Sequence, residues 1–212
     1  MAKIKQQSLA DQVYSQVKDE ILNGKLKAND RISEEDLAEL YGVSRTPIRD
    51  ALKKLADYGL IKIIPRSHAI VNSVSPEEAQ DIAKLRIALE QFSIDNLTEE
   101  SLNENFEDLC RYASECQFAL SMSNKAKVFE NDSLFHITLI KISNNYSLVD
   151  LYTRLDAKVQ LLRLEQDTSM DDLTKYISQH NDIIDLLKKR KFDELKVLLC
   201  SHIMHDLTNH IN

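Results

Sequence analysis

The sequence predicts a mainly α-helical protein with a small N-terminal part and a larger, all-helical C-terminal part. The chain of 212 residues is 43% hydrophobic and 29% charged, yet it has only 3 Gly and 3 Pro, a composition typical of helical globular proteins. Apolar residues recur with helical spacing along most of the chain. Two short β-rich runs end just before residue 74, so we expect one domain at 1–74 and a second at 75–212.

The first predicted helix begins at Ser8, because Ser8-x-x-Asp11 has the form of a capping box. Val13, Val17 and Ile21 then recur every four residues and form an apolar stripe. Gly24 ends the helix.

Two further helices lie close together in the sequence. The turn before them contains Asn29, a residue type that tolerates the left-handed backbone conformation. Ser33 caps a short helix that ends at Gly42. After a tight turn, the next helix starts at Ser44 and stops at Gly59.

Two β-rich runs, 60–64 and 69–71, follow the third helix and are joined by a turn at 65–68. They predict a β-hairpin. Two helices separated by a tight turn and followed by a hairpin are typical of a winged helix-turn-helix, whose third helix enters the major groove of DNA.

The third helix has polar side chains where DNA contact would need them. Its apolar residues face inward on a helical wheel, which leaves Arg45, Thr46 and Arg49 on the leading outer face. Arg45 and Arg49 are one turn apart, so their guanidinium groups can grip phosphates or bridge guanine O6 and N7. An ordinary solvated helix face is the alternative, and the helix-turn-helix context favours DNA. The predicted DNA-binding residues, including the hairpin tip, are Ser44, Arg45, Thr46, Arg49, Lys53, Arg66 and His68.

The net charge of −7 is unevenly distributed. Residues 1–73 carry 12 Lys and Arg against 10 Asp and Glu, whereas residues 74–212 carry 15 against 24. The acidic C-terminal part is a poor binder of polyanions. Any surface for double-stranded DNA should therefore lie in the N-terminal part.

The C-terminal part begins with a strong helix start, because Ser75 is a preferred N-cap residue and Pro76 is favoured at the first helical position. Everything beyond it has helical periodicity. We place about six helices at 76–98, 102–121, 124–143, 147–168, 171–190 and 192–211.

Four polar residues of the C-terminal part fall within apolar stripes on helical wheels. They are Asp132, His136, His180 and His202. A single buried histidine is more often a hydrogen-bonded core residue, but one carboxylate and three imidazoles on three helices suit a divalent transition metal such as Zn²⁺, Ni²⁺ or Mn²⁺. His205 and Asp206 follow His202 closely, and either could support or replace a ligand.

Arg86 also lies within an apolar arc, where a guanidinium group needs a carboxylate partner. That partner could be Glu90, in an intramolecular ion pair, or it could be the carboxylate of a small-molecule effector. The two interpretations are evenly balanced.

The run 42–52, from Gly42-Val43-Ser44-Arg45 to Ala51-Leu52, resembles the recognition helix of the GntR family. Ala28-Asn29 stands where that family usually has Pro-Gly, and His68 stands where the wing tip usually has Gly. The C-terminal part resembles the ligand domain of the FadR subfamily, in its shorter VanR-like form. The motifs that carry this resemblance include Asp132-x-x-Phe135-His136 and Ser143-x-Asn145.

The resemblance implies a homodimeric transcription regulator that binds palindromic operator DNA. It also implies a metal-bound organic acid as effector, with Arg86 and Asn145 as effector-binding residues and repression as the mode of control. A metalloenzyme and a regulator with a purely structural metal are the alternatives. We expect no enzyme activity, because no catalytic motif such as H-E-x-x-H is present.

The sequence also indicates a cellular compartment. No apolar run approaches a membrane span, and the first residues lack the apolar core of a signal peptide. The three cysteines lack C-x-x-C spacing, so a disulfide framework is not expected. We therefore predict a cytoplasmic protein without a membrane partner.

Overall fold

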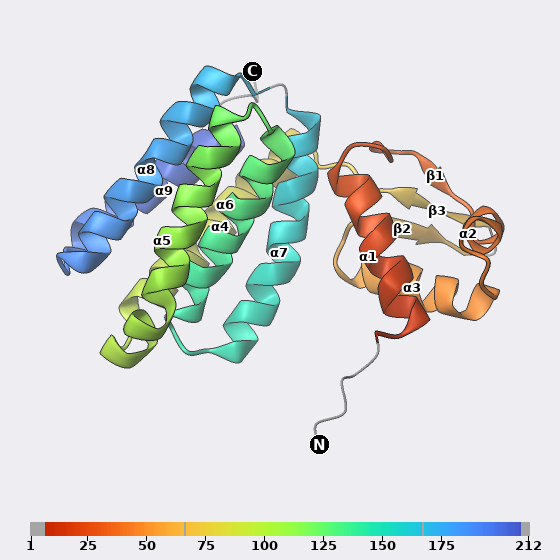
Figure 1. The fold of residues 1–212 in the computed structure, drawn as a ribbon, viewed down its shortest axis with the longest axis horizontal. Coiled ribbons are helices and arrows are strands. Elements are labelled where there is room, and N and C mark those ends of the chain that lie inside the picture. Colours follow the sequence, from red (N-terminus) through yellow and green to blue (C-terminus); the bar gives the residue numbers. More distant parts are fainter. Residues whose placement is uncertain (1–6, 66, 167, 209–212) are drawn as a thin grey trace. The chain divides into compact units, whose positions relative to one another are not determined.

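The computed structural model describes residues 7–65, 67–166 and 168–208, and side chains as far as residue 205. The chain forms two compact units, Met1–Ser73 and Val74–Asn212 (Figure 1). The mainly α-helical fold class predicted from the sequence is confirmed, with a helix-turn-helix unit followed by a helical one.

The described part of the N-terminal unit combines three helices with a small antiparallel sheet (Figure 1). The sheet order is β1-β3-β2, and the predicted hairpin is formed by β2 and β3, with Ile63 opposite Ala69. Strand β1 was not predicted, because two residues cannot show an alternating pattern. In chain order the elements are α1 (Leu9–Leu22), β1 (Arg31–Ile32), α2 (Glu34–Tyr41), α3 (Arg45–Asp57), β2 (Ile61–Ile64) and β3 (His68–Val71).

Local sequence explains where these elements begin and end. Ser8 and Ser33 cap α1 and α2 by accepting hydrogen bonds from backbone amides three residues on. Asn29 adopts a left-handed conformation with φ of 69°, as its residue type predicted, and Gly42 ends α2 with φ of 63°. The core of this unit comprises Val13, Val17, Ile21, Ile48, Leu52, Leu55, Leu60 and Ile61.

The described part of the C-terminal unit contains six helices, and their described ends lie within three residues of the predicted ones. The predicted end of the last helix at 211 lies outside the described residues. They are α4 (Pro76–Asp95), α5 (Glu99–Ser121), α6 (Lys125–Lys141), α7 (Tyr146–Glu165), α8 (Met170–Lys188) and α9 (Phe192–Thr208). Helix α6 packs against α4, α5 and α7, while α8 packs against α5 and α9 (Figure 1). No helix of the described residues combines the length and the apolar character needed to cross a bilayer.

The interior of this unit is divided between an apolar core and a polar one. The apolar core joins α5, α6, α8 and α9 through residues such as Leu109, Phe135, Leu187 and Leu199. Helices α4, α6, α7, α8 and α9 also bury polar side chains, and buried polar groups need partners. The main ones are Arg86, Glu90, Asp132, His136, Asp156, Gln160, Arg163, His180 and His202.

Candidate metal centre and DNA-binding face

The four predicted metal ligands meet in the interior of the C-terminal unit. Asp132 and His136 lie one turn apart on α6, His180 comes from α8 and His202 from α9. All four side chains are 0% exposed, and one candidate ligand atom from each lies within 4.8 Å of the others. This cluster could hold a metal ion.

Hydrogen bonds at the outer ring nitrogens orient two of the histidines. His136 Nδ1 lies 3.0 Å from a carboxylate oxygen of Glu90, and His202 Nδ1 lies 2.9 Å from Oε1 of Gln179. Because both partners accept hydrogen bonds, a ring in its neutral form carries its proton on Nδ1 and directs a lone pair from Nε2 into the cluster. The two Nε2 atoms face each other at 3.1 Å, where two lone pairs repel unless a proton or a cation lies between them.

Asp132 and His180 are also incompletely satisfied by the protein. Asp132 Oδ1 is 3.1 Å from His180 Nε2 and 3.6 Å from His136 Nε2. Neither contact has hydrogen-bond geometry, and both ring nitrogens of His180 lack a hydrogen-bond partner among the described residues. Burying polar atoms without partners costs free energy of folding. These nitrogen and oxygen atoms would gain partners by ligating one divalent cation together.

The protonation states favour metal binding. Burial lowers the pKa of His180, and burial with the neighbouring imidazoles holds the pKa of His202 well below its usual range. Burial alone would raise the pKa of Asp132, but the Arg163 guanidinium and the imidazoles hold it well below its usual range. At neutral pH Asp132 is therefore a charged carboxylate, and His180 and His202 are neutral imidazoles, which are their ligating forms.

Arg163 of α7 supports the carboxylate from behind. Its Nη2 lies 2.6 Å from Asp132 Oδ2 and donates to the Tyr176 hydroxyl at 2.9 Å. The side chain is 1% exposed. Arg163 was not predicted from the sequence, although it continues an apolar stripe of α7 that includes Tyr152 and Val159. A polar residue within such a stripe is the same signal that identified Asp132.

A second buried network joins Arg86 to the cluster. Arg86 Nε donates to Glu90 Oε1 and to the Tyr152 hydroxyl, each at 2.9 Å, while the other Glu90 oxygen faces His136. The intramolecular alternative for Arg86 is thus present in the structure. Burial would raise the pKa of Glu90, but His136 and Arg86 lower it to about 2. Glu90 is therefore an anion that connects α4 to a candidate metal ligand.

The remaining residues predicted near the centre lie elsewhere. Asn145 is exposed and caps α7 by accepting from the backbone amide of Leu148 at 3.1 Å. His205 is exposed on α9, and the side chain of Asp206 lies outside the described residues. The structure thus gives Asn145 a local capping role and brings it into neither buried network.

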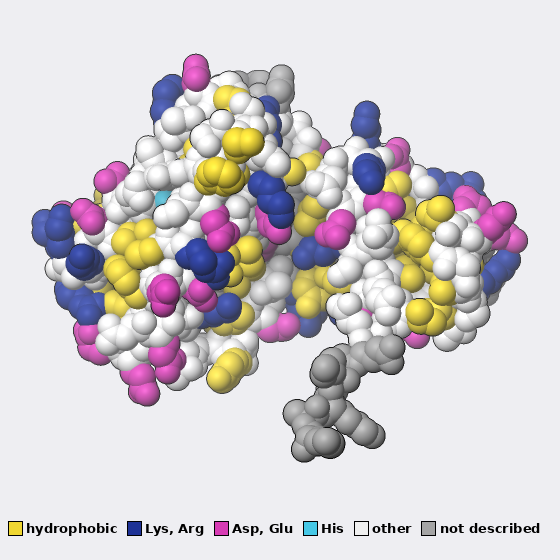
Figure 2. All heavy atoms as spheres, in the orientation of Figure 1, with side chains coloured by type: hydrophobic (Ala, Val, Ile, Leu, Met, Phe, Trp, Pro, Cys, Tyr) yellow, Lys and Arg dark blue, Asp and Glu magenta, His cyan; other side chains and the backbone are white. Residues whose placement is uncertain are grey.

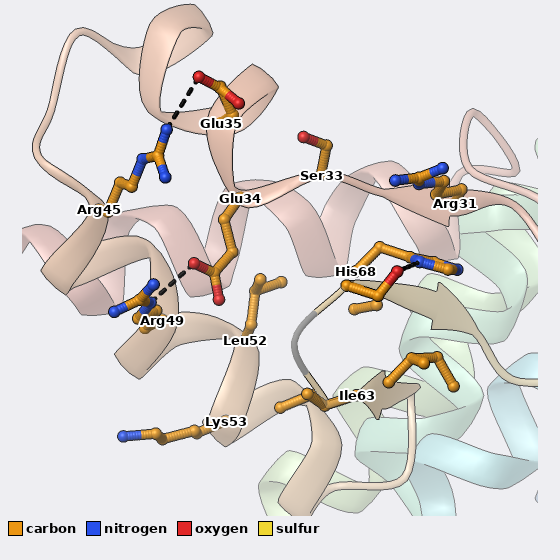
Figure 3. Close-up of a pocket in the computed structure, with 13 residues that line it drawn as sticks. Arg31, Ser33, Glu34, Glu35, Arg45, Arg49, Leu52, Lys53, Ile63 and His68 are labelled. Atoms are coloured by element: carbon orange, nitrogen blue, oxygen red, sulfur yellow. Dashed lines mark hydrogen bonds and ion pairs between the residues drawn. The ribbon is translucent and has the colours of Figure 1, made fainter.

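The described members of the predicted DNA-binding set belong to α3, its N-cap and the hairpin. Ser44, Arg45, Thr46, Arg49 and Lys53 are exposed on α3 or at its N-cap, whereas Ile48 is buried. A hollow of about 510 Å³ lies between α3, the start of α2 and the hairpin (Figure 3). His68 lines this hollow from β3, and Arg66 lies outside the described residues.

The hollow also contains charged residues that the sequence analysis did not predict. Arg31 of β1 adds a cation (Figure 3). Glu35 accepts a hydrogen bond from Arg45 at 2.8 Å, and Glu34 accepts one from Arg49 at 2.7 Å. The cations of the hollow outnumber its two carboxylates, so its charge remains suited to phosphate.

Both units match known protein families. Residues 9–71 match the bacterial regulatory proteins of the gntR family, and residues 81–205 match the FCD domain. The uncharacterised HTH-type transcriptional regulator YdhC of Bacillus subtilis is 29% identical, over 92% of this chain and 88% of that protein. The HTH-type transcriptional repressor RspR of Escherichia coli is 25% identical, over 93% and 86%. The structure of E. coli McbR/YncC has the same fold, with a TM-score of 0.78, 23% identity and coverage of 95% and 96%. Both of these Bacillus and Escherichia relatives are described as transcriptional regulators.

Proposed function

We propose, from the premise that this chain belongs to the GntR family of DNA-binding transcription regulators and carries an FCD domain, that it is a repressor controlled by an organic acid at a metal centre. The observation that carries the proposal is the buried cluster of Asp132, His136, His180 and His202, with its two facing imidazole lone pairs. These residues would hold one Zn²⁺, Ni²⁺ or Mn²⁺ ion. A bound ion would supply Lewis-acid coordination positions for a carboxylate oxygen.

The chain's own residues would select an acid. Arg86 and Arg163 are buried cations, and a planar guanidinium group binds a carboxylate through two parallel hydrogen bonds. Glu90 and Tyr152 already accept hydrogen bonds from Arg86 Nε, so an effector carboxylate would compete with them for the Arg86 guanidinium group. Such an exchange would release Glu90 from its present position and disturb His136, which gives the effector a means of changing the helical unit.

DNA binding would use the exposed face of α3. The exposed side chains of Arg45, Thr46 and Arg49 would read base edges, and Lys53 would contact the phosphate backbone with His68 of the hairpin. One recognition helix contacts only a few base pairs, so two copies bound to a palindrome would provide the required affinity.

The second copy would pack on the helical unit. Leu85 and Phe92 are both 45% exposed and lie two turns apart on α4, while Leu151 is 48% exposed on the adjacent α7. Acidic and basic side chains are interspersed over much of the face of this unit drawn in Figure 2. We expect the full chain to sediment as a dimer and the Leu85→Glu/Phe92→Glu variant as a monomer. A monomeric parent protein at micromolar concentration would contradict the dimer.

One experiment separates an effector site from a structural metal. Protein dialysed against EDTA is titrated with Zn²⁺, Ni²⁺ and Mn²⁺, and each form is then mixed with a panel of small mono- and dicarboxylic acids. We expect the metal to raise the melting temperature and at least one acid to raise it further only in the metal-loaded protein. If the metal stabilises the protein but no acid adds to the effect or changes DNA affinity, the metal is structural and the effector proposal is wrong.

A further inference from the structure

The guanidinium groups of the recognition helix are joined to carboxylates of α2. Arg45 donates from Nη2 to Glu35, and Arg49 donates from Nε to Glu34 (Figure 3). Both arginine side chains are more than half exposed, whereas the exposed fraction is 33% for Glu34 and 74% for Glu35. The two ion pairs therefore differ in the edge of the guanidinium group that they use and in the exposure of the carboxylate to solvent.

This difference matters for base recognition. Arginine reads guanine through two parallel hydrogen bonds to O6 and N7, and the terminal Nη1/Nη2 edge can make both. Glu34 binds Arg49 at Nε, so that this bond leaves the terminal edge pointing away from the carboxylate. Glu35 binds Arg45 at Nη2, which belongs to that edge. Restricting a flexible arginine before it binds reduces the entropy lost on binding.

We propose that Glu34 is a positioning residue for base recognition by Arg49, and that Glu35 competes with DNA for Arg45. The proposal rests on the placement of α3 in the major groove given above. Glu34 should raise affinity for the correct sequence only, because its benefit depends on the guanine contact. Glu35 should lower affinity for every duplex, because its bond to Arg45 Nη2 must open before the terminal edge of that guanidinium group can reach a phosphate or a base.

The N-terminal position of these residues offers a simpler explanation that must be tested. Glu34, Glu35 and Asp36 form the acidic first turn of α2, where negative charge stabilises a helix through its dipole. Asp36 shares that position, but no ion pair of Asp36 with an arginine is found among the described residues. The Asp36→Asn variant therefore removes the same helix interaction without touching either guanidinium group.

The test uses the full chain and two duplexes. One is selected by the parent protein from a random double-stranded library, and the other is a scrambled duplex of the same composition. Binding of Glu34→Gln, Glu35→Gln and Asp36→Asn is followed by fluorescence anisotropy at several salt concentrations. We expect Glu34→Gln to weaken binding of the selected duplex about fivefold or more, with the scrambled duplex unchanged. Glu35→Gln should strengthen both about two- to fivefold, with Asp36→Asn changing neither.

Each result decides a part of the proposal. If Glu34→Gln keeps the parent's ratio of selected to scrambled affinity, or Asp36→Asn lowers that ratio equally, Glu34 does not position Arg49. If Glu35→Gln strengthens neither duplex, Glu35 does not compete with DNA. A parent protein that enriches no sequence overturns the placement of α3 together with this inference, and that outcome is distinct because it appears before any variant is made.

Discussion

Replacing Asp132 by Asn should destabilise the C-terminal unit strongly even without metal. The Asp132 carboxylate lies 2.6 Å from Arg163, and the two side chains are 0% and 1% exposed. Removing one partner of a buried ion pair leaves an uncompensated charge, at a cost of about 3–5 kcal/mol. For a unit of this size, that corresponds to a fall in melting temperature of roughly 10–20 °C.

The same contact predicts that two substitutions will not be additive. Arg163→Met alone leaves the Asp132 carboxylate buried without its cation, whereas Asp132→Asn with Arg163→Met removes both charges of the pair. We expect the double variant to lose at least about 2 kcal/mol less than the sum of the single variants. This difference measures the ion pair separately from the metal.

The assay is scanning calorimetry of the full chain in EDTA, followed by the same scans with Zn²⁺. In EDTA the melting temperatures report the ion pair alone, and the increase on adding Zn²⁺ reports metal binding. Zn²⁺ should raise the melting temperature of Asp132→Asn less than that of the parent, because the variant also lacks the carboxylate ligand. An Asp132→Asn protein within about 1 kcal/mol of the parent in EDTA, or single variants whose effects simply add, would refute the buried pair.

Three further predictions concern DNA, metal and pH. Arg49→Ala should weaken operator binding by about 1–3 kcal/mol at fixed salt without changing the melting temperature, as measured by anisotropy and calorimetry. His180→Ala with His202→Ala should abolish stoichiometric metal in elemental analysis while preserving DNA affinity of the metal-free protein; retained metal would contradict the ligand assignment. Burial raises the pKa of Asp156 above 3.8, so the folded state binds its proton more readily and the parent loses stability as pH rises past that value. Asp156→Asn should therefore gain free energy of unfolding relative to the parent between pH 4 and pH 7 in urea denaturation, and an equal difference at both pH values would contradict the buried carboxylate.

Helical periodicity and capping residues were sufficient to predict the helices of both units, because both are local signals. Ser33 and Gly42 mark the ends of α2 in the sequence and in the structure alike. Strand β1 escaped prediction because its pairing with β3, Arg31 opposite Ile70, is a tertiary contact between residues far apart in the chain. A strand of two residues has no pattern of its own.

The candidate site was predictable only in part for the same reason. Polar residues inside apolar stripes identified His180 and the other cluster residues, because burial leaves a trace in each helix separately. The partner of each buried group depends on helix packing, so Arg163 and Gln179 could not be assigned to Asp132 and His202. The role of Asn145, in contrast, follows from local sequence alone. Asn is favoured at helix N-caps, and Asn145 caps α7 in the structure.

The buried networks also define what a switch in this protein would require. An effector can shift an equilibrium only by the difference in its affinity for two states, so it must meet groups that have two arrangements. In the proposed mechanism Arg86 and Glu90 would meet this condition, because an effector carboxylate could replace Glu90 as the partner of Arg86 and of His136. Helix α4 begins at Pro76, within three residues of the end of the DNA-binding unit at Ser73. A change at Glu90 would therefore act on the helix that begins next to this boundary. Because such coupling is reciprocal, operator DNA should alter effector affinity by the same factor by which the effector alters DNA affinity.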